Sequence, residues 1–269
     1  MAIFAKKENT LVNIVKIGGN VIDNSDKLNA FLKSFAGISC PKILIHGGGK
    51  IATKIAEQLG IKTVMVEGRR ITDEAMRDVV TMVYGGLVNK QIVAKLQSNN
   101  CNAIGLTGAD GKVILAQKRP VKTIDYGFVG DILQVNSTFI KSLLDQNITP
   151  VFAPLTFDME GNMLNTNADT QASTIATSLS ALVPVNLIYC FEKKGVLSDV
   201  NDEDSVISAL NPENYESFKS AGVIYEGMIP KLDNAFEALK KGVQKVIICQ
   251  AEDLHEAIET GNAGTKITL

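Results

Sequence analysis

The sequence has little histidine, no tryptophan and only four cysteines, and these scarcities exclude several classes of chemistry. His46 and His255 are the two histidines, which argues against a histidine-built metal centre and against a hydrolase that relays protons through histidine. The cysteines show no CxxC spacing, so we interpret them as buried free thiols of a cytoplasmic protein. We expect no metal site made by the protein alone. Lysines, carboxylates and backbone amides remain as the groups that can do chemistry.

The sequence also lacks a surplus of charge and a long apolar run. Lysine and arginine number 27 against 29 aspartates and glutamates, so no nucleic acid or anionic membrane is expected as a partner. No apolar run approaches the ~18 residues that span a bilayer. The first residues lack the apolar core of a signal peptide. The 269 residues suffice for one large α/β domain or for two lobes.

Apolar runs of strand length alternate with helical periodicity along the chain, which predicts an α/β fold with a mostly parallel sheet. The strands are predicted at residues 11–17, 42–46, 101–106, 148–154, 187–191 and 245–250. Three further short strands are predicted at 113–115, 121–124 and 128–133. The helices are predicted at 27–35 with Ser25 as N-cap, at 50–58, from Thr72 onward, and at 139–144, 168–182 and 229–241.

Glycines directly follow the first two strands. The first strand runs into Lys-Ile-Gly-Gly-Asn, with Lys16, Gly18 and Gly19, and the second into His-Gly-Gly-Gly-Lys, with Gly48 and Gly49. Ligands of parallel sheets bind beyond the carboxyl ends of the strands, and glycine lets backbone N–H groups approach an anion there. The pattern favours a phosphate site that Lys16 faces; the alternative is a pair of tight turns beside a solvated lysine. Neither loop fits GxxxxGK[ST] or GxGxxG, which disfavours P-loop and Rossmann proteins.

Two more segments contain candidate ligand-binding residues. Arg69 and Arg70 precede the long helix, where the planar fork of one of them would suit a substrate carboxylate, although an exposed arginine pair is often only solvated. Asn165 and Asp169 flank the start of another helix. They either cap that helix, or Asn165 binds a ligand while Asp169 holds lysine ammonium groups.

The last candidate is Gly227 followed by Lys231 at a helix start. A cation in the first turn opposes the helix dipole, which hints that a phosphate compensates it there. A solvated lysine explains the sequence equally well.

In chain order, these motifs resemble the amino acid kinase family, and within it the acetylglutamate kinase branch. A further match is the segment 82–90, Met-Val-x-Gly-Gly-x-Val-Asn-Lys, inside the long helix. The resemblance covers nearly the whole chain and implies a three-layer sandwich around a mostly parallel open sheet. It also implies an N-terminal lobe, 1–180, that binds an acyl amino acid and dimerises, and a C-terminal lobe, 181–269, that binds ATP.

The resemblance implies phosphorylation of the side-chain carboxylate of N-acetyl-L-glutamate, or of another N-acyl-glutamate such as N-succinyl-glutamate, in the second step of arginine biosynthesis. ATP would be the donor, with Mg²⁺ held mainly by the nucleotide phosphates. The acceptor is already an anion, so no general base is needed, and catalysis reduces to positioning and charge stabilisation. The alternatives are an acetylaminoadipate or aspartate kinase of the same fold, or a catalytically silent regulator that binds an amino acid or nucleotide.

The resemblance also assigns roles by position. Lys16 and Lys231 would neutralise charge on the transferring phosphoryl group, and Asp169 would orient both lysines. The substrate would be held by Gly48, Gly49, Arg70 and Asn165. The phosphates and the nucleotide would be bound by Gly18, Gly19, Gly195 and Gly227.

The chain departs from the family pattern at three places. Lys50 and Arg69 stand where the family has small or apolar residues, and their charge near the acceptor would suit a succinyl group. The nucleotide-side loop reads Glu-Lys-Lys-Gly-Val at 192–196 in place of the family's Asp-Val-x-Gly-Val.

The quaternary structure is expected to be a homodimer that is insensitive to arginine, because the short lead-in before the first strand is too short for the additional helix of hexameric members. The apolar residues of the long helix would either form the dimer surface or pack in the core; they are Met76, Val79, Val80 and Val83.

Overall fold

The structure, a computed structural model, describes residues 10–224 and 228–269. Its centre is an eight-stranded sheet in the order β12-β14-β13-β11-β1-β2-β8-β5. These strands are β12 (Ala209–Leu210), β14 (Thr265–Ile267), β13 (Lys245–Gln250), β11 (Val185–Phe191), β1 (Val12–Ile17), β2 (Lys42–His46), β8 (Thr149–Phe152) and β5 (Ala103–Leu106). Of the paired neighbours in this sheet, β13 and β14 alone run antiparallel among the described residues. The predicted parallel α/β sheet is confirmed.

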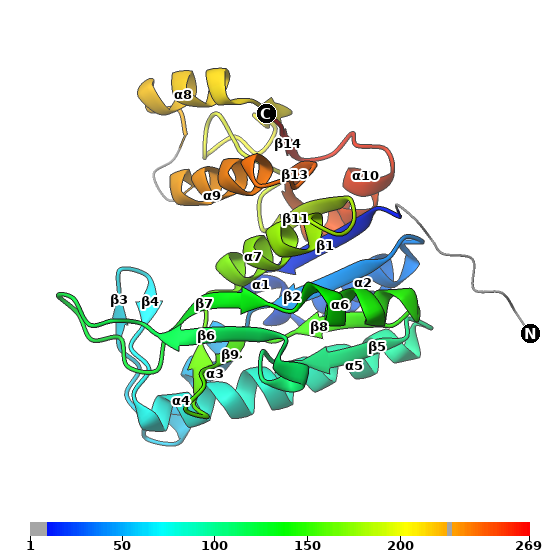
Figure 1. Ribbon diagram of the computed structural model, residues 1–269. Coiled ribbons are helices and arrows are strands. Elements are labelled where there is room, and N and C mark those ends of the chain that lie inside the picture. Colours follow the sequence, from blue (N-terminus) through cyan, green and yellow to red (C-terminus); the bar gives the residue numbers. More distant parts are fainter. Residues whose placement is uncertain (1–9, 225–227) are drawn as a thin grey trace, which may run out of the picture.

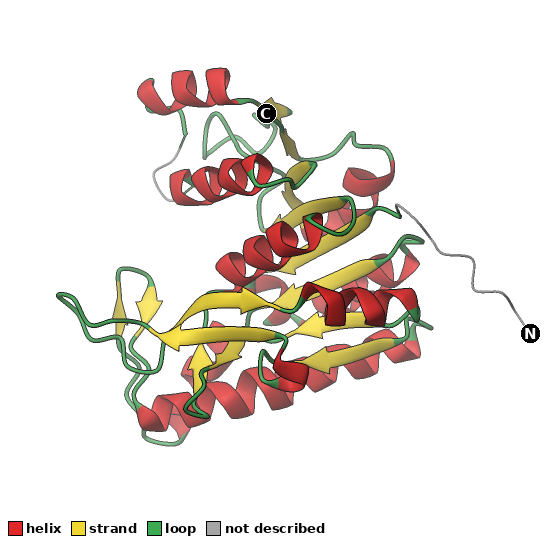
Figure 2. Cartoon of the chain, in the orientation of Figure 1, coloured by secondary structure: helices red, strands yellow, loops and turns green. Residues whose placement is uncertain are grey.

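Helices cover both faces of this sheet, which gives three layers (Figures 1 and 2). Successive residues of a strand point to opposite faces. Val12 and Ile14 therefore pack in one core cluster, and Val15 and Ile17 in the other. The first cluster includes helices α6 (Ser137–Asp145), α7 (Ala168–Ser180), α8 (Pro212–Ser220) and α9 (Ile229–Lys240). The second includes α1 (Gly19–Ile22), α2 (Ser25–Gly37), α3 (Gly49–Gln58), α4 (Glu74–Val80), α5 (Asn89–Ser98) and α10 (Leu254–Glu259).

A second, smaller sheet lies beside the first and has the order β10-β9-β6-β7. Its strands are β6 (Ile114–Lys118), β7 (Gly130–Val135), β9 (Leu155–Phe157) and β10 (Met163–Asn165). The strands β3 (Met65–Val66) and β4 (Arg69–Arg70) form a separate two-stranded ribbon. The predicted strand at 121–124 is wrong. The amide of Arg119 donates to the carbonyl of Val129 at 2.8 Å, which closes the β6–β7 ladder and leaves the intervening residues as an exposed loop.

The long predicted helix is continuous but not regular. Between α4 and α5 the chain forms a π-helix, η1 (Thr81–Val88), that contains the glycine pair Gly85 and Gly86. The apolar residues that we considered for a dimer surface are all at most 2% exposed and belong to the core. Met82 and Leu87 are instead the exposed apolar side chains of this segment. Helical periodicity alone did not separate the two possibilities, because a face that packs in the core and a face that packs on a second copy have the same apolar spacing.

The expectation about the lead-in and arginine rests on residues 1–9, which lie outside the described part of the chain. Among the residues that the structure describes, no helix is long and apolar enough to cross a membrane.

The cap of α2 differs by one residue from the prediction, and this difference can be tested. Asn24, in an extended conformation, accepts hydrogen bonds from the amides of Asp26 and Lys27, both at 3.0 Å, whereas Ser25 is the first helical residue. We expect Asn24→Ala to lower the free energy of unfolding by about 1 kcal/mol, the usual cost of a lost N-cap. Urea denaturation measures it. Ser25→Ala is the matched control and should change stability by less; the opposite ranking would contradict the observed cap.

Candidate active site

Two cavities open at the carboxyl ends of the central strands and meet at one loop. The larger cavity has a volume of about 600 Å³ and the smaller cavity about 230 Å³. Both are lined by Gly47, Gly48 and Gly49, which follow β2. The larger cavity is bordered by residues from both halves of the chain, and the smaller one by residues between 47 and 168. Ligands in the two cavities would therefore face one another across the glycine loop.

Two helices begin at this shared edge without a side-chain cap. Gly18 is the N-cap of α1 and Gly48 the N-cap of α3, and neither helix start receives a side-chain hydrogen bond. A Cβ atom on Gly47 would lie 3.7 Å from the amide nitrogen of Gly19, so the two loops are side by side. At Gly48, φ is +146° and a Cβ atom would come 3.0 Å from the ring of Tyr84. Uncapped helix amides beside a cavity offer free N–H donors, the groups that the expected anion site at these loops requires.

Lys16 forms the central ion pair of the larger cavity. Its Nζ lies 2.7 Å from Oδ1 of Asp169, and the lysine side chain is 9% exposed. Lys16 comes from the end of β1 and Asp169 from the first turn of α7, which packs on the same face of the sheet. The hydroxyl of Tyr189 donates to the backbone carbonyl of Asp169 at 3.3 Å. Of the two readings of Asp169, the structure therefore favours the one in which it holds a lysine.

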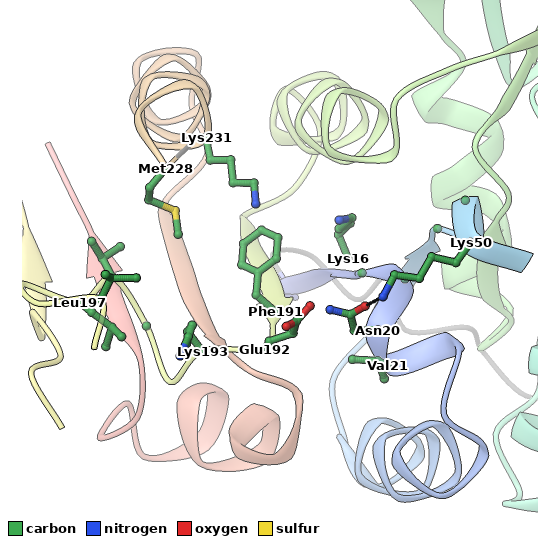
Figure 3. A pocket seen from close by; sticks show the side chains of 18 residues that line it. Lys16, Asn20, Val21, Lys50, Phe191, Glu192, Lys193, Leu197, Met228 and Lys231 are labelled. Atoms are coloured by element: carbon green, nitrogen blue, oxygen red, sulfur yellow. Dashed lines mark hydrogen bonds between the residues drawn. The ribbon is translucent and has the colours of Figure 1, made fainter. Parts of the chain in front are cut away.

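Lys231 reaches the same cavity from the first turn of α9. Its Nζ lies 3.9 Å from the centre of the Phe191 ring, and Figure 3 shows the side chain pointing at that ring. Among the described residues no ion pair joins Lys231 to Asp169, so Asp169 does not orient both lysines in this structure. Burial lowers the pKa of Lys231, and the nearby charge of Lys16 lowers it further, while Asp169 opposes the shift.

Arg70 lies at the inner wall of the smaller cavity and is 7% exposed. Its Nη2 donates to the carbonyl of Gly49 and to Oγ1 of Thr53, both at 2.9 Å, and Nη1 donates to Oγ1 of Thr63 at 3.2 Å. These bonds fix the plane of the guanidinium and tie it to the glycine loop. The arginine is therefore a buried, oriented cation and not a solvated one.

The structure assigns helix capping and cavity lining to two different asparagines, Asn167 and Asn165. Asn167 caps α7, because its side chain accepts from the amide of Thr170 at 2.9 Å. Asn165 lines the smaller cavity and donates to Oγ1 of the buried Thr72 at 3.0 Å. This hydrogen bond leaves the side-chain oxygen of Asn165 as a potential ligand group.

The nucleotide-side loop is held by packing and by surface ion pairs. Gly195 lines the larger cavity, but a Cβ atom there would lie 2.7 Å from Oγ1 of Thr265, so close packing also requires this glycine. Lys193 and Lys194 pair with Glu203 and Asp204 at 2.9 and 2.6 Å. Gly227, the remaining predicted residue, lies outside the described residues.

Lys50 and Arg69 do not share one pocket. Lys50 lines the larger cavity, where it contacts Asn20 and lies 3.8 Å from Oδ2 of Asp23 (Figure 3). The expectation that its charge lies beside the acceptor stays a prediction, which depends on the cavity that binds the acceptor. Arg69 does line the smaller cavity. The contact of Lys50 with Asn20 joins the start of α3 to α1, which no local sequence pattern reveals.

The structure adds site residues that sequence reasoning missed. Phe191 and Met228 line the larger cavity, and Tyr84 and Arg119 line the smaller one. An aromatic residue at the end of a buried strand, next to a glycine loop, was the available signal for Phe191. No cluster of three or more His, Cys, Asp or Glu side chains that could hold a metal occurs in residues 10–224 and 228–269.

The chain is similar to known proteins along nearly its whole length. A sequence model of the "Amino acid kinase family" matches residues 12–250. A protein of Cytophaga hutchinsonii named acetylglutamate kinase is 61% identical over 256 residues, covering 94% of this chain and 97% of the relative. A protein of Bacteroides fragilis with the same name is 54% identical and covers 95% and 96%. The solved structure of smu.665 from Streptococcus mutans UA159 is 27% identical, covers 96% and 98%, and has a TM-score of 0.76.

Below the glycine loop, a buried histidine predicts a pH dependence of stability. Nδ1 of His46 donates to the carbonyl of Gly47 at 2.7 Å, and Nε2 accepts from the side-chain amide of Asn89 at 3.1 Å, so the ring is neutral. Burial lowers the pKa of His46 from 6.5 to about 4. The unfolded chain thus binds a proton that the folded chain does not, and this contribution to stability is lost as the pH falls from about 6.5 to about 4.

We expect this loss to be roughly 3 kcal/mol in the free energy of unfolding. Urea titrations of the wild type and of His46→Gln at several pH values measure it. Carboxylates titrate alike in both proteins, so the difference between the two curves isolates the histidine. Parallel curves over this range would contradict the assignment.

Proposed function

The chain belongs to the amino acid kinase family, and we propose that it transfers the γ-phosphoryl group of ATP to the side-chain carboxylate of N-acetyl-L-glutamate. One observation carries the proposal: two cavities of unequal size share a glycine loop, and a paired lysine, Lys16, stands beside that loop. The names of relatives at 54–61% identity support the acceptor. The product is an acyl phosphate, as expected for the second step of arginine biosynthesis.

The larger cavity suits ATP. Its glycine loops and its two lysines offer amides and cations to the phosphates, and the apolar side chains of Val196, Leu197 and Met228 offer a surface to the base. We propose that Mg²⁺ enters with ATP and is held mainly by the nucleotide phosphates. The protein offers few carboxylates that could hold the ion itself: Glu192 lines this cavity, and the nearby Asp169 is already paired with Lys16.

The smaller cavity suits the acceptor. Arg70 presents an oriented guanidinium for the α-carboxylate, and Asn165 with the amides of Gly48 and Gly49 provides further hydrogen-bonding groups. Since residues between 47 and 168 line this cavity, we propose that the N-terminal lobe, 1–180, binds the acyl amino acid. The C-terminal lobe, 181–269, then supplies the nucleotide side.

The reaction is a displacement at phosphorus that needs no base. A carboxylate oxygen of the acceptor attacks the γ-phosphorus, the bond to the β–γ bridging oxygen breaks, and ADP leaves with that electron pair. Lys16, Lys231 and the amides of Gly18 and Gly19 oppose the negative charge on the oxygens during transfer. Asp169 holds Lys16 in place and thereby preorganises the site.

We further propose that the protein works as a cytoplasmic homodimer. The four free cysteines suit a reducing compartment, and the exposed Met82 and Leu87 give the π-helical segment an apolar surface for a second copy. An acetylaminoadipate or aspartate kinase is disfavoured by the names of the relatives. A silent regulator is disfavoured because Lys16, Asp169 and Lys231 gather at one cavity.

A hydroxamate trap tests the function directly. Purified protein with MgATP and hydroxylamine should form the hydroxamate from N-acetyl-L-glutamate and none from unacylated glutamate. N-succinyl-L-glutamate, assayed alongside, decides which acyl group is preferred. Arg69, which lines the smaller cavity, would supply a positive charge for the succinyl carboxylate. Absence of hydroxamate with every acylated acceptor would overturn the proposal.

The two lysines should affect turnover more than binding. Lys16→Ala and Lys231→Ala should each lower kcat by about a hundredfold or more, the scale for loss of one transition-state donor. The KM values should change much less, because these contacts strengthen as charge develops. Steady-state kinetics measure both constants. A near-normal kcat with a raised KM would instead make that lysine a binding residue.

Arg70 should affect the acceptor alone. Arg70→Lys keeps the charge but loses the planar fork, so we expect a large rise of KM for N-acetyl-L-glutamate and little change for ATP. Initial rates with each substrate varied in turn measure this. Lys62→Arg, an exchange of the same type on an exposed residue, is the control. Equal losses for both substrates would assign Arg70 to folding of the glycine loop.

A further inference from the structure

Phe191 is the aromatic residue that both lysines of the larger cavity share. Nζ of Lys231 lies 3.9 Å from the centre of its ring and Nζ of Lys16 lies 5.2 Å from it. Figure 3 shows the ring directly below the end of the Lys231 side chain, with Lys16 to its right. The face of an aromatic ring is electron-rich and attracts an ammonium group within about 6 Å of its centre. One ring therefore attracts two cations that repel each other.

The ring itself is held in place by its own strand. Tyr189 and Phe191 lie two positions apart on β11 and so share one face of the sheet. Their rings stack with centroids 6.0 Å apart and an interplanar angle of 12°. The hydroxyl of Tyr189 in turn donates to the backbone carbonyl of Asp169, the residue whose carboxylate pairs with Lys16.

The two lysines differ in their need for this ring. Lys16 has the carboxylate of Asp169 at 2.7 Å. For Lys231, the part of the chain that the structure describes shows no ion pair, and the Phe191 ring is the group against its ammonium. We propose that Phe191 is a positioning residue for phosphoryl transfer, which holds Lys231 toward the phosphate end of the larger cavity. This inference rests on the proposed function.

A ring suits this position better than a second carboxylate. A carboxylate would bind Lys231 strongly, add negative charge next to the triphosphate, and compete with the phosphoryl oxygens for the ammonium. A ring face attracts the cation without a net charge. Lys231 thus stays in place when the cavity is empty and remains available as charge develops on the phosphoryl group.

The kcat values of variants at position 191 give the first test. Phe191→Leu removes the ring face but keeps an apolar side chain, and we expect kcat to fall about tenfold, or about 1.4 kcal/mol in the barrier. The KM for ATP should change little. Phe191→Tyr restores a ring and should restore most of the kcat. A wild-type kcat in Phe191→Leu, or no rescue by tyrosine, would overturn the proposal.

Fluorinated phenylalanines separate the electrostatics of the ring from its shape. Each fluorine withdraws electrons from the ring face, so mono-, di- and trifluorophenylalanine placed at position 191 should lower kcat stepwise. The matched control is the same series at Phe35, whose ring lies 5.4 Å from Nζ of the buried Lys42 in the core. A flat series at Phe191, or an equal decline at Phe35, would overturn the proposal. These variants keep the wild-type shape even if Phe191→Leu does not fold.

The titration of Lys231 provides a readout that does not need activity. The charged groups facing it are Lys16 from β1, Asp169 from α7 and Glu192 from the loop after β11. A ring face favours the cation, so its removal in Phe191→Leu should lower the pKa of Lys231 further. NMR of ¹³C-lysine-labelled protein measures this, with the resonance assigned by Lys231→Arg. An unchanged pKa overturns the inference, whereas a wild type that forms no hydroxamate overturns the proposed function.

Discussion

The ion pair between Lys16 and Asp169 is the interaction on which the site depends. Two anions, a triphosphate and a carboxylate, must come together, so the protein has to keep cations at a partly buried position before either arrives. A buried ammonium is costly without a partner. Asp169, 2.7 Å away on α7, supplies that partner and joins the helix to the end of β1. The charge that we propose for phosphate binding is thus also part of the packing between helix and sheet.

The fold makes this arrangement possible because parallel strands end together. β1 and β2 are neighbours and both lead into glycines, so two uncapped helix starts face the same space. Arg70 is tied to the second of these helix starts through its bond to the carbonyl of Gly49, which places a cation on the side of the loop that faces the smaller cavity. A single glycine loop therefore lines both cavities, and a shift of this loop would change the shape of both.

Much of this arrangement follows from the sequence, and the parts that do not are mostly non-local. The strands around Lys16 and His46 were predicted because buried parallel strands are short apolar runs, and glycine marks their ends. The exposed loop after Pro120 and the burial of Val79 depend on what lies opposite in space, whereas the cap at Asn24 is a local choice between two neighbouring residues that both suit an N-cap. The position of Lys50 in the larger cavity depends on how α3 packs. The contact of Phe191 with Lys231 joins residues 40 positions apart, and no local period encodes it.

The nucleotide-side loop, residues 192–196, combines a closely packed glycine with lysines that form ion pairs on the surface. Gly195 is fixed, because its close approach to Thr265 admits no side chain, and the amide of Val196 donates to the hydroxyl of that threonine at 2.8 Å. The charges of Lys193 and Lys194 are paired on the surface with Glu203 and Asp204, where water and salt screen them. These two lysines therefore contribute little fixed positive charge to the cavity. The phosphate end depends instead on Lys16 and Lys231, whose positions are set by a carboxylate and by an aromatic ring.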